Sequence, residues 1–382
     1  MITTKKIQMV DLKGQYLKIK DEVDAGIQEV INTTTFINGP AVKEFQSDLE
    51  KYLNVKHVIP CANGTDALQI AMMALGLKPG DEVITASFTY VATAEVIGLL
   101  GLTPVLVDVN PDTFDIDVNA LERNITSKTK AIVPVHLFGQ CADLEQIMAI
   151  AKKYNLYVIE DVAQAIGADY TFSDGKRAKA GTIGTVGCTS FFPSKNLGCY
   201  GDGGAMYTND DELAAKLKMI SHHGQSVLYK HDIVGVNSRL DTIQAAVLKV
   251  KLKHLDEYAS ARNAAADFYD KAFVNHPKLK VPVRSKKSTH VFHQYTLQLN
   301  GVVSTDNYRG KLREQLAEKG IPAMIYYPIP LHHQKAFTSE RYKDGDFPVT
   351  EKLCASVLSL PMHTELDEET LTYITKTVLE LA

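Results

Sequence analysis

The sequence has few cysteines, and none of them stands in a metal-binding pattern. Five occur in 382 residues, and no pair has the two-residue spacing of a zinc or redox site. We therefore expect small, buried side chains in a reducing compartment. These scattered cysteines are Cys61, Cys141, Cys188, Cys199 and Cys354.

Long apolar runs are also missing. The most apolar stretch without a charge, residues 96–107, has 12 residues and contains glycine and proline, which is too short to span a bilayer. The first six residues are not followed by a long apolar segment, so no signal peptide is visible. We expect a soluble, cytoplasmic protein that has no membrane partner.

Neither sign of charge dominates the chain. Its 41 basic and 45 acidic residues give a net charge of -4, so no electrostatic attraction to nucleic acid or to an anionic membrane is expected. Partners should be small molecules or further copies of the same chain. With 45% hydrophobic residues, the chain is long enough for one large core and a second, smaller domain.

From about residue 56, short β-branched runs alternate with amphipathic stretches such as 66–75, 92–100 and 144–154. This alternation predicts an α/β fold with a mainly parallel, seven-stranded sheet between helices. Functional sites in such sheets lie at the carboxyl ends of the strands. The predicted strands are 56–61, 82–86, 104–109, 131–136, 156–160, 188–192 and 205–208.

The pattern changes near Ser238. Apolar residues at three- and four-residue spacing between 240 and 255 predict one long helix that links two domains. We expect a large domain over residues 1–250, including N-terminal helices, and a small α+β domain over 251–382. The segments on which this rests are helices 16–31, 42–52, 307–319 and 367–381, and strands 292–299 and 322–327.

A lysine follows one predicted strand directly. Lys195 lies just beyond the apolar strand 188–192, after Pro193 and close to the glycines of 201–204. A partly desolvated lysine loses its proton more readily and can form a Schiff base with an aldehyde. An ordinary solvated surface lysine is the alternative that this segment alone leaves open.

Asp161 ends another predicted strand. A buried acid is costly without a partner, and a protonated pyridine nitrogen would be one. Gln164, three residues on, could share that face and hydrogen-bond an oxygen on the same ring. The alternative for Asp161 is a helix cap.

Two further strand ends carry residues that suit a flat, phosphorylated ligand. Gly64 and Thr65 open a helix after the first strand, where free N–H groups favour a phosphate, and Ser190 could add a hydroxyl. Tyr90, within 87–93, could stack on a heterocycle. An ordinary helix start and a buried core aromatic are the respective alternatives.

Taken together and in this order, these segments resemble the DegT/StrS family of sugar aminotransferases, which are pyridoxal-phosphate (PLP) enzymes of fold type I. The likeness covers nearly the whole chain. Besides the segments above, it rests on 10–13, 36–40, 135–139, 201–204, 223–224, 235–239, 327–332 and 360–363.

The resemblance implies a role for each of these residues. Lys195 matches the lysine that binds PLP covalently and moves the proton, and Asp161 matches the partner of the pyridine nitrogen. The family site is shared across a dimer interface, which implies a homodimer. The remaining implied cofactor contacts are Gln164 near the ring hydroxyl, Tyr90 (or Phe88) stacked on the ring, Gly64, Thr65 and Ser190 at the phosphate, and Asn237 at the phosphate of the neighbouring subunit's cofactor.

Within the family, the chain most resembles enzymes that aminate the 3-position of UDP-linked 2-acetamido-3-keto uronic acids, which contribute to surface polysaccharides such as lipopolysaccharide. The implied donor is glutamate, with pyridoxamine phosphate as the intermediate cofactor form. Alternatives are a 3- or 4-aminotransferase for a neutral dTDP-, UDP- or GDP-linked keto-deoxysugar, a PLP-dependent sugar dehydratase, and a non-catalytic sugar-binding relative. The expected sugar contacts are Arg239, Tyr326 (where close relatives have histidine), Tyr327 and His332, with His333 beside it.

Overall fold

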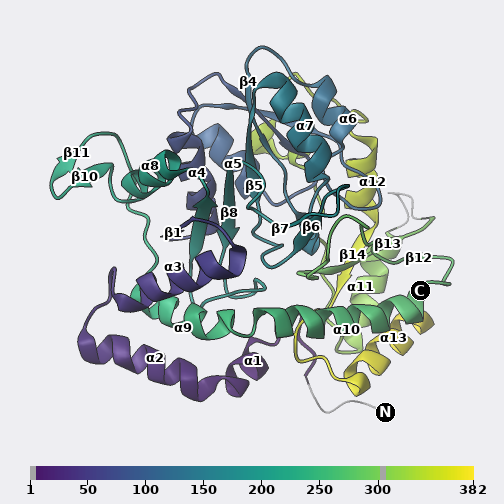
Figure 1. Ribbon diagram of the computed structural model, residues 1–382. Helices are drawn as coiled ribbons and strands as arrows, with labels where there is room; N and C mark the ends of the chain where they lie inside the picture. Colours follow the sequence, from purple (N-terminus) through teal and green to yellow (C-terminus); the bar gives the residue numbers. More distant parts are fainter. Residues whose placement is uncertain (1–5, 302–306) are drawn as a thin grey trace.

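The computed structural model describes residues 6–301 and 307–382 (Figure 1). Residues 1–5, which belong to the stretch considered for a signal peptide, lie outside the described residues. Two sheets organise the chain, one with seven strands and one with three. Within the described ranges, no helix is long and apolar enough to cross a membrane.

The large sheet confirms the predicted α/β architecture. Its strand order is β1-β9-β8-β5-β4-β2-β3, and only β9 runs antiparallel to its neighbours. Each predicted strand between residues 56 and 208 overlaps one of these strands. Their bounds are β1 (His57–Cys61), β2 (Glu82–Ala86), β3 (Thr103–Val107), β4 (Thr129–Val133), β5 (Tyr157–Asp161), β8 (Val186–Ser190) and β9 (Gly204–Thr208).

Both faces of this sheet are buried, which explains its nearly continuous apolar strands. Successive side chains of a strand point to opposite faces, so Val83 and Ile84 of β2 belong to different core clusters. Helices α4 (Gly64–Ala74) and α8 (Asp211–Ser221) cover one face. The helices that pack on the other face include α3 (Pro40–Leu53), α6 (Val118–Arg123), α7 (Leu144–Tyr154) and α9 (Thr242–Leu252).

Helix starts follow local capping chemistry. Asn63, Asp143 and Asp210 precede α4, α7 and α8, and each side chain accepts a hydrogen bond from a backbone N–H of the first turn. Because these caps lie directly after strands or short loops, they set where each connecting helix begins. The remaining large-domain helices are α1 (Leu12–Lys18), α2 (Lys20–Thr33) and α5 (Ala92–Leu99).

The three-stranded antiparallel sheet forms the centre of the C-terminal part. Its apolar side chains pack with helices into one core cluster that includes Tyr269, Leu297 and Ile374. The elements are β12 (Leu279–Lys280), β13 (Tyr295–Leu299), β14 (Val357–Leu360), α10 (Leu255–Phe273), α11 (Tyr308–Glu318), α12 (Pro348–Ser356) and α13 (Glu368–Leu381).

Two sequence predictions about this part were wrong. The single long helix is two helices, α9 and α10, which follow one another across the lower half of the molecule, above α2 and α13 (Figure 1). The amides of Lys253 and His254 bond to carbonyls three residues back, which tightens the chain and ends α9. The predicted domain boundary between residues 250 and 251 falls inside α9 and stays a prediction.

The predicted strand 322–327 is also absent. Only Met324 pairs, in an isolated bridge with Ser359 beside β14. Prolines at 322 and 328 cannot donate to a ladder, which limits pairing on both sides of that bridge. The chain turns instead toward the large sheet and brings Tyr326 and Tyr327 there.

Two short hairpins complete the fold. Strands β6 (Asp169–Thr171) and β7 (Arg177–Lys179) pair close to the large sheet. Strands β10 (Gln225–Val227) and β11 (Lys230–His231) pair in an arm that projects from the body near α8 (Figure 1). This arm (residues 225–234) returns to the body just before Asn237.

Candidate active site

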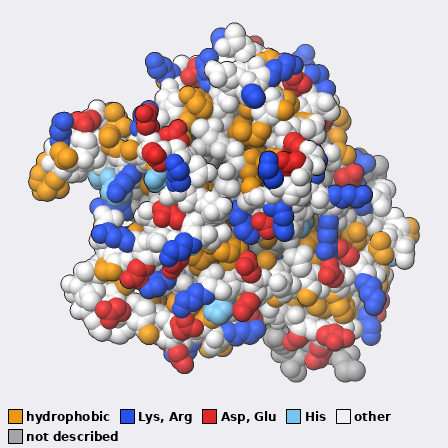
Figure 2. Space-filling model, in the orientation of Figure 1, with side chains coloured by type: hydrophobic (Ala, Val, Ile, Leu, Met, Phe, Trp, Pro, Cys, Tyr) orange, Lys and Arg blue, Asp and Glu red, His pale blue; other side chains and the backbone are white. Residues whose placement is uncertain are grey.

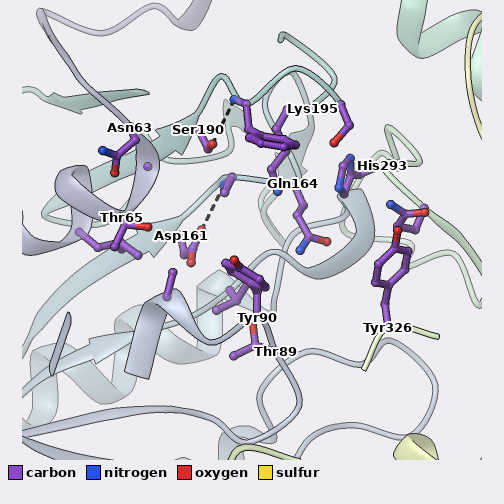
Figure 3. Close-up of a pocket in the computed structure, with 18 of the residues that line it drawn as sticks. Asn63, Thr65, Thr89, Tyr90, Asp161, Gln164, Ser190, Lys195, His293 and Tyr326 are labelled. Atoms are coloured by element: carbon purple, nitrogen blue, oxygen red, sulfur yellow. Dashed lines mark hydrogen bonds between the residues drawn. The ribbon is translucent and has the colours of Figure 1, made fainter. Parts of the chain in front are cut away.

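A cavity of about 660 Å³ lies where the carboxyl ends of the parallel strands meet (Figure 3). Residues that follow β1, β2, β4, β5 and β8 line it, together with two short segments from the C-terminal part. It contains nine of the residues singled out in the sequence: Gly64, Thr65, Tyr90, Asp161, Gln164, Ser190, Lys195, Tyr326 and Tyr327.

Lys195 lies in a tight loop after β8. Its backbone N–H donates to the carbonyl of Phe192 at 2.8 Å, and the buried Lys251 of α9 donates through Nζ to the carbonyl of Gly198 at 2.7 Å. Desolvation lowers the pKa of Lys195 to about 8, although the negative charge of Asp161 opposes the shift. With this pKa, about one tenth of the amine is uncharged at pH 7, far more than for an ordinary solvated lysine.

Asp161 is the last residue of β5 and is buried at the base of the cavity. Its Oδ2 accepts a hydrogen bond from Thr93 Oγ1 at 2.8 Å, and its Oδ1 accepts one from the backbone N–H of Ala163 at 3.1 Å. The bond from Ala163 closes a turn after the strand, and no helix begins there, so Asp161 does not cap a helix. A carboxylate with two donors and a buried position is oriented toward whatever occupies the cavity.

Gln164 is fixed at both ends of its amide. Its Oε1 accepts from the backbone N–H of Phe138 at 2.9 Å, and its Nε2 donates to the hydroxyl of Tyr327 at 3.1 Å. The amide nitrogen carries two protons, so one remains for a ligand. The contact also joins the large sheet to the C-terminal segment that carries Tyr327.

A phosphate-sized corner forms where α4 meets β8. A Cβ on Gly64 would lie 2.6 Å from Cβ of Ser190, so only glycine permits this approach. The first N–H groups of α4 have no partner within the helix, and the hydroxyls of Thr65 and Ser190 lie beside them. Such a corner suits a phosphate dianion.

Three of the expected site residues do not line this cavity. Asn237 is exposed and pairs by its backbone with His222. Arg239 lines a separate cavity of about 590 Å³ whose other basic residues include Lys43 and Lys218. Within one chain, both residues are therefore separated from Lys195.

His332 belongs to a hydrogen-bonded network instead. It is buried, with Nδ1 2.7 Å from Ser87 Oγ and Nε2 3.3 Å from a carboxylate oxygen of Glu351. The pKa of His332 is lowered, mainly by burial and to a lesser extent by the positive charge that His333 can carry. This network ties the segment after Tyr327 to the end of β2 and to α12.

Sequence reasoning missed several residues of the cavity. Thr93, which contacts Asp161 without lining the cavity, lies within the segment 87–93 and in the first turn of α5, and its hydrogen bond to a residue 68 positions away has no local pattern. His293 and Gln294 reach the cavity from the C-terminal part, and no motif marked them. Asn63, the cap of α4, directly precedes Gly64 and Thr65 and had only its capping chemistry as a signal.

These residues fit PLP. The glycine-lined corner and helix start would hold its phosphate, Asp161 would face a ring nitrogen, and Lys195 offers an amine for its aldehyde. Tyr90 is 58% exposed and lies at the edge of the cavity, where its ring is available for stacking (Figure 3).

Known proteins resemble the chain over nearly its full length. The sequence profile of the DegT/DnrJ/EryC1/StrS aminotransferase family matches residues 17–379. The UDP-2-acetamido-2-deoxy-3-oxo-D-glucuronate aminotransferase of Pseudomonas aeruginosa is 49% identical, with 94% of this chain and 96% of that protein covered. The UDP-N-acetyl-3-dehydro-alpha-D-glucosamine 3-aminotransferase of Acidithiobacillus ferrooxidans is 43% identical, with 95% and 94% covered.

A solved structure, NtdA from Bacillus subtilis with the bound cofactor PMP, superposes with a TM-score of 0.88. It is 32% identical, and the alignment covers 100% of this chain and 86% of that one. The seven-stranded sheet, the cavity at its strand ends and these full-length matches agree with one another. The chain therefore belongs to the DegT/DnrJ/EryC1/StrS aminotransferase family, and it is a sugar aminotransferase whose cofactor is PLP.

Proposed function

We propose that this aminotransferase moves an amino group from glutamate to the 3-position of a UDP-linked 2-acetamido-3-keto uronic acid, for surface polysaccharide such as lipopolysaccharide, in the cytoplasm. The observation that carries the proposal is the Lys195–Asp161 cavity in a chain 49% identical to a 3-oxo-glucuronate aminotransferase. The second relative also acts at position 3 of a UDP-linked sugar, by its name.

Different residues of the cavity bind different parts of the cofactor. Gly64, Thr65 and Ser190 hold the phosphate of PLP, and Asp161 keeps the ring nitrogen protonated by its negative charge. When bound, PLP supplies the carbonyl that takes up the amino group and a ring that withdraws electrons.

Lys195 moves the proton in both halves of the reaction. With a pKa of about 8, its neutral amine removes the proton from the carbon that bears the amino group. The resulting ammonium would then return the proton to the carbon that accepts it. Tyr90 would offer its ring for stacking on the bound cofactor, and Gln164 would offer its remaining N–H to it.

A homodimer with shared sites completes this arrangement. The arm exposes a run of large apolar side chains, among them Leu228, Tyr229 and Val234, which are 75%, 85% and 85% exposed. Hydrophobic atoms accordingly gather at the tip of the projection on the left of Figure 2. A second copy of the chain would bury them and carry Asn237 and Arg239 to the other subunit's cavity.

In this proposed dimer, the carboxylate of the uronic acid binds a cationic side chain of the second subunit. Among the described residues of the cavity the charged ones are Lys195, Asp161 and Asp202, and none is an arginine. Arg239 would therefore supply the guanidinium from across the interface, where it can bind a carboxylate with two parallel hydrogen bonds.

A neutral keto-deoxysugar is the second candidate. The lack of an arginine in the described wall of the cavity favours it, because such a sugar needs no cation. Tyr326, where the family resemblance leads us to expect a histidine, also changes the expected sugar contacts.

A substrate competition separates the two. The purified enzyme, loaded with amine from glutamate, receives a UDP-linked 3-keto uronic acid together with neutral 3- and 4-keto sugars. We expect kcat/KM to favour the uronic acid by at least about tenfold, the value of one charge-assisted contact. A preference for the neutral sugars would remove the uronate proposal and leave the aminotransferase intact.

A further inference from the structure

His293 is a buried polar side chain on the wall of the cavity that the proposed function leaves unused. It is only 6% exposed, and its Nδ1 has no hydrogen-bond partner. Among the described residues, buried unpartnered side-chain atoms at this cavity belong to His293 and Thr89. Figure 3 shows His293 and Tyr326 on the side of the cavity opposite Asn63 and Thr65.

The backbone around His293 is held by three different parts of the fold. The N–H of Val291 donates to the carbonyl of Gly139 at 2.8 Å, and Asn196, next to Lys195, donates to the carbonyl of Val291 at 2.8 Å. Arg262 of α10 donates to the carbonyl of Phe292 at 2.9 Å.

Phe292 itself adopts the left-handed region, with φ 44°. A bulky residue is rare there, so the surrounding contacts must hold it in place. The segment is therefore built to keep the next side chain, His293, at the cavity wall.

The imidazole is neutral. Burial, followed by the positive charges of Lys195 and Arg262, lowers the pKa of His293 well below its usual range. A neutral ring has one N–H donor and one acceptor. A buried N–H without an acceptor is rarer and more costly than a buried lone pair, so the proton belongs on Nε2 and the lone pair on the unpartnered Nδ1.

Nε2 is then the hydrogen-bond donor of a ring that lines the cavity. Substrates of the proposed reaction carry carboxylate and hydroxyl oxygens, while Lys195 is the one cation among the described lining residues and is occupied in proton transfer. A neutral donor on the wall opposite the phosphate corner can bind such an oxygen without adding charge beside Lys195.

We infer that His293 is a substrate-binding residue whose Nε2–H donates a hydrogen bond to a carboxylate or hydroxyl oxygen of the molecule that exchanges the amino group. The inference rests on the proposed function. Two molecules bring such an oxygen in turn, glutamate and the keto-sugar, and the two half-reactions distinguish them.

Three variants test the donor. His293→Phe keeps a flat ring and removes the N–H, His293→Gln restores an N–H donor, and His293→Leu replaces the phenyl variant if that ring does not fit. Each half-reaction is followed in a single turnover by the cofactor's absorbance, which gives a saturation constant and a limiting rate. Calorimetry with the unreactive 3-hydroxy form of the UDP-uronic acid adds a dissociation constant without turnover.

We expect His293→Phe to raise the saturation constant of at least one half-reaction about tenfold, the size of a lost hydrogen bond, with the limiting rate nearly unchanged. His293→Gln recovers most of the loss. A change with keto-sugar and its 3-hydroxy form identifies the sugar as the bound molecule, and a change with glutamate alone identifies the donor.

The inference is overturned if both constants stay within about twofold of the wild type. It is equally overturned if only the limiting rates fall, or if the Gln and Phe variants lose binding equally while their melting temperatures drop.

His290→Asn is the matched control, because His290 lies in the same segment and its Nδ1 accepts from the N–H of Phe292, a role that Asn Oδ1 can take over. If the wild-type enzyme aminates no UDP-linked keto uronic acid, the proposed substrate fails independently, and the glutamate half-reaction still decides the role of His293.

Discussion

Thr93 and Asp161 show how one hydrogen bond, from the first turn of α5 to the end of β5, orients a charged group of the site. The hydroxyl of Thr93 is one of two donors to the buried carboxylate, the other being the backbone N–H of Ala163. Without the bond from Thr93, the Asp161 carboxylate would keep a single donor and could rotate. Because Thr93 and Asp161 are both buried, water does not replace the lost hydrogen bond.

Replacing Thr93 by valine, which has the same shape without the hydroxyl, is expected to lower the free energy of unfolding by about 1–3 kcal/mol. The pH dependence of the bound cofactor's absorption should shift as well, because the partner of its ring nitrogen is no longer fixed. Urea unfolding and absorption titration measure the two effects. Thr93→Ser, which keeps the hydroxyl, is the control; equal behaviour of serine and valine variants would contradict a role for this bond.

Lys195 carries a second prediction, about pH. Burial lowers its pKa to about 8, and only the neutral amine attacks an aldehyde. Since the lowered pKa means that the proton is lost as pH rises through 8, the rate at which cofactor-free protein binds PLP covalently should rise about tenfold per pH unit below 8 and level off above it.

Borohydride reduction followed by mass analysis of residue 195 measures this link. Pyridoxamine phosphate, which makes no bond to lysine, provides the background rate, and Lys195→Ala should show no reducible link. A rate that keeps rising to pH 10 would show that the amine has an ordinary pKa.

At the scale of elements, the junction of α4 and β8 builds the phosphate corner. Gly64→Ala places a methyl group against Ser190, with 2.6 Å between the two Cβ atoms. We expect a loss of about 1–3 kcal/mol in the free energy of unfolding and a weaker affinity for PLP, because α4 must move away from the strand.

The matched control is Gly98→Ala. Gly98 lies in α5 and no atom is within 4 Å of its would-be Cβ, so alanine there should stabilise the helix by roughly 1 kcal/mol. Urea unfolding and cofactor titration compare the pair. If Gly64→Ala bound PLP as tightly as the wild type, the corner would not be the phosphate site.

The strands of the large sheet and the helices between them were predictable because the residue pattern within each short segment indicates a strand or a helix. Strand β2 and helix α7 occupy the residues that the sequence predicts, 82–86 and 144–154. The exceptions were α9 and α10, whose apolar residues continue in one helical pattern although the two helices pack against different neighbours. The spacing of apolar residues indicates which face of a helix is buried, but it does not indicate which neighbouring element covers that face.

At the scale of the whole molecule, the proposed homodimer gives the arm its role. Leu228→Asp places a charge at a side chain that is 75% exposed, and we expect it to convert the proposed homodimer into monomers. Sedimentation velocity measures the mass, and turnover should fall with it because in the proposed dimer each site takes Asn237 and Arg239 from the other subunit. Leu379→Asp, on the exposed side of α13, is the control and should leave the mass unchanged.

A mixing experiment tests the shared site directly. Lys195→Ala and Arg239→Ala are each expected to be nearly inactive. In a mixed dimer of the two, one cavity combines an intact Lys195 with an intact Arg239 from the other chain, so mixing should restore activity. No recovery, in dimers shown to have exchanged subunits, would contradict a site built from both chains.

The sequence by itself determined the strand–helix alternation, the lysine and acid at strand ends, and the glycine and serine of the phosphate corner, because each of these is a local property of a few consecutive residues. Only the tertiary structure decided which distant residues meet. Thr93 donates a hydrogen bond to Asp161, Gln164 donates one to Tyr327, and His332 is hydrogen-bonded to Ser87 outside the cavity. His293 lines the cavity although it lies in the C-terminal part of the chain. These contacts join residues between 68 and 245 positions apart, and such pairs are chosen by how the two sheets and their helices pack, which no short stretch of sequence encodes.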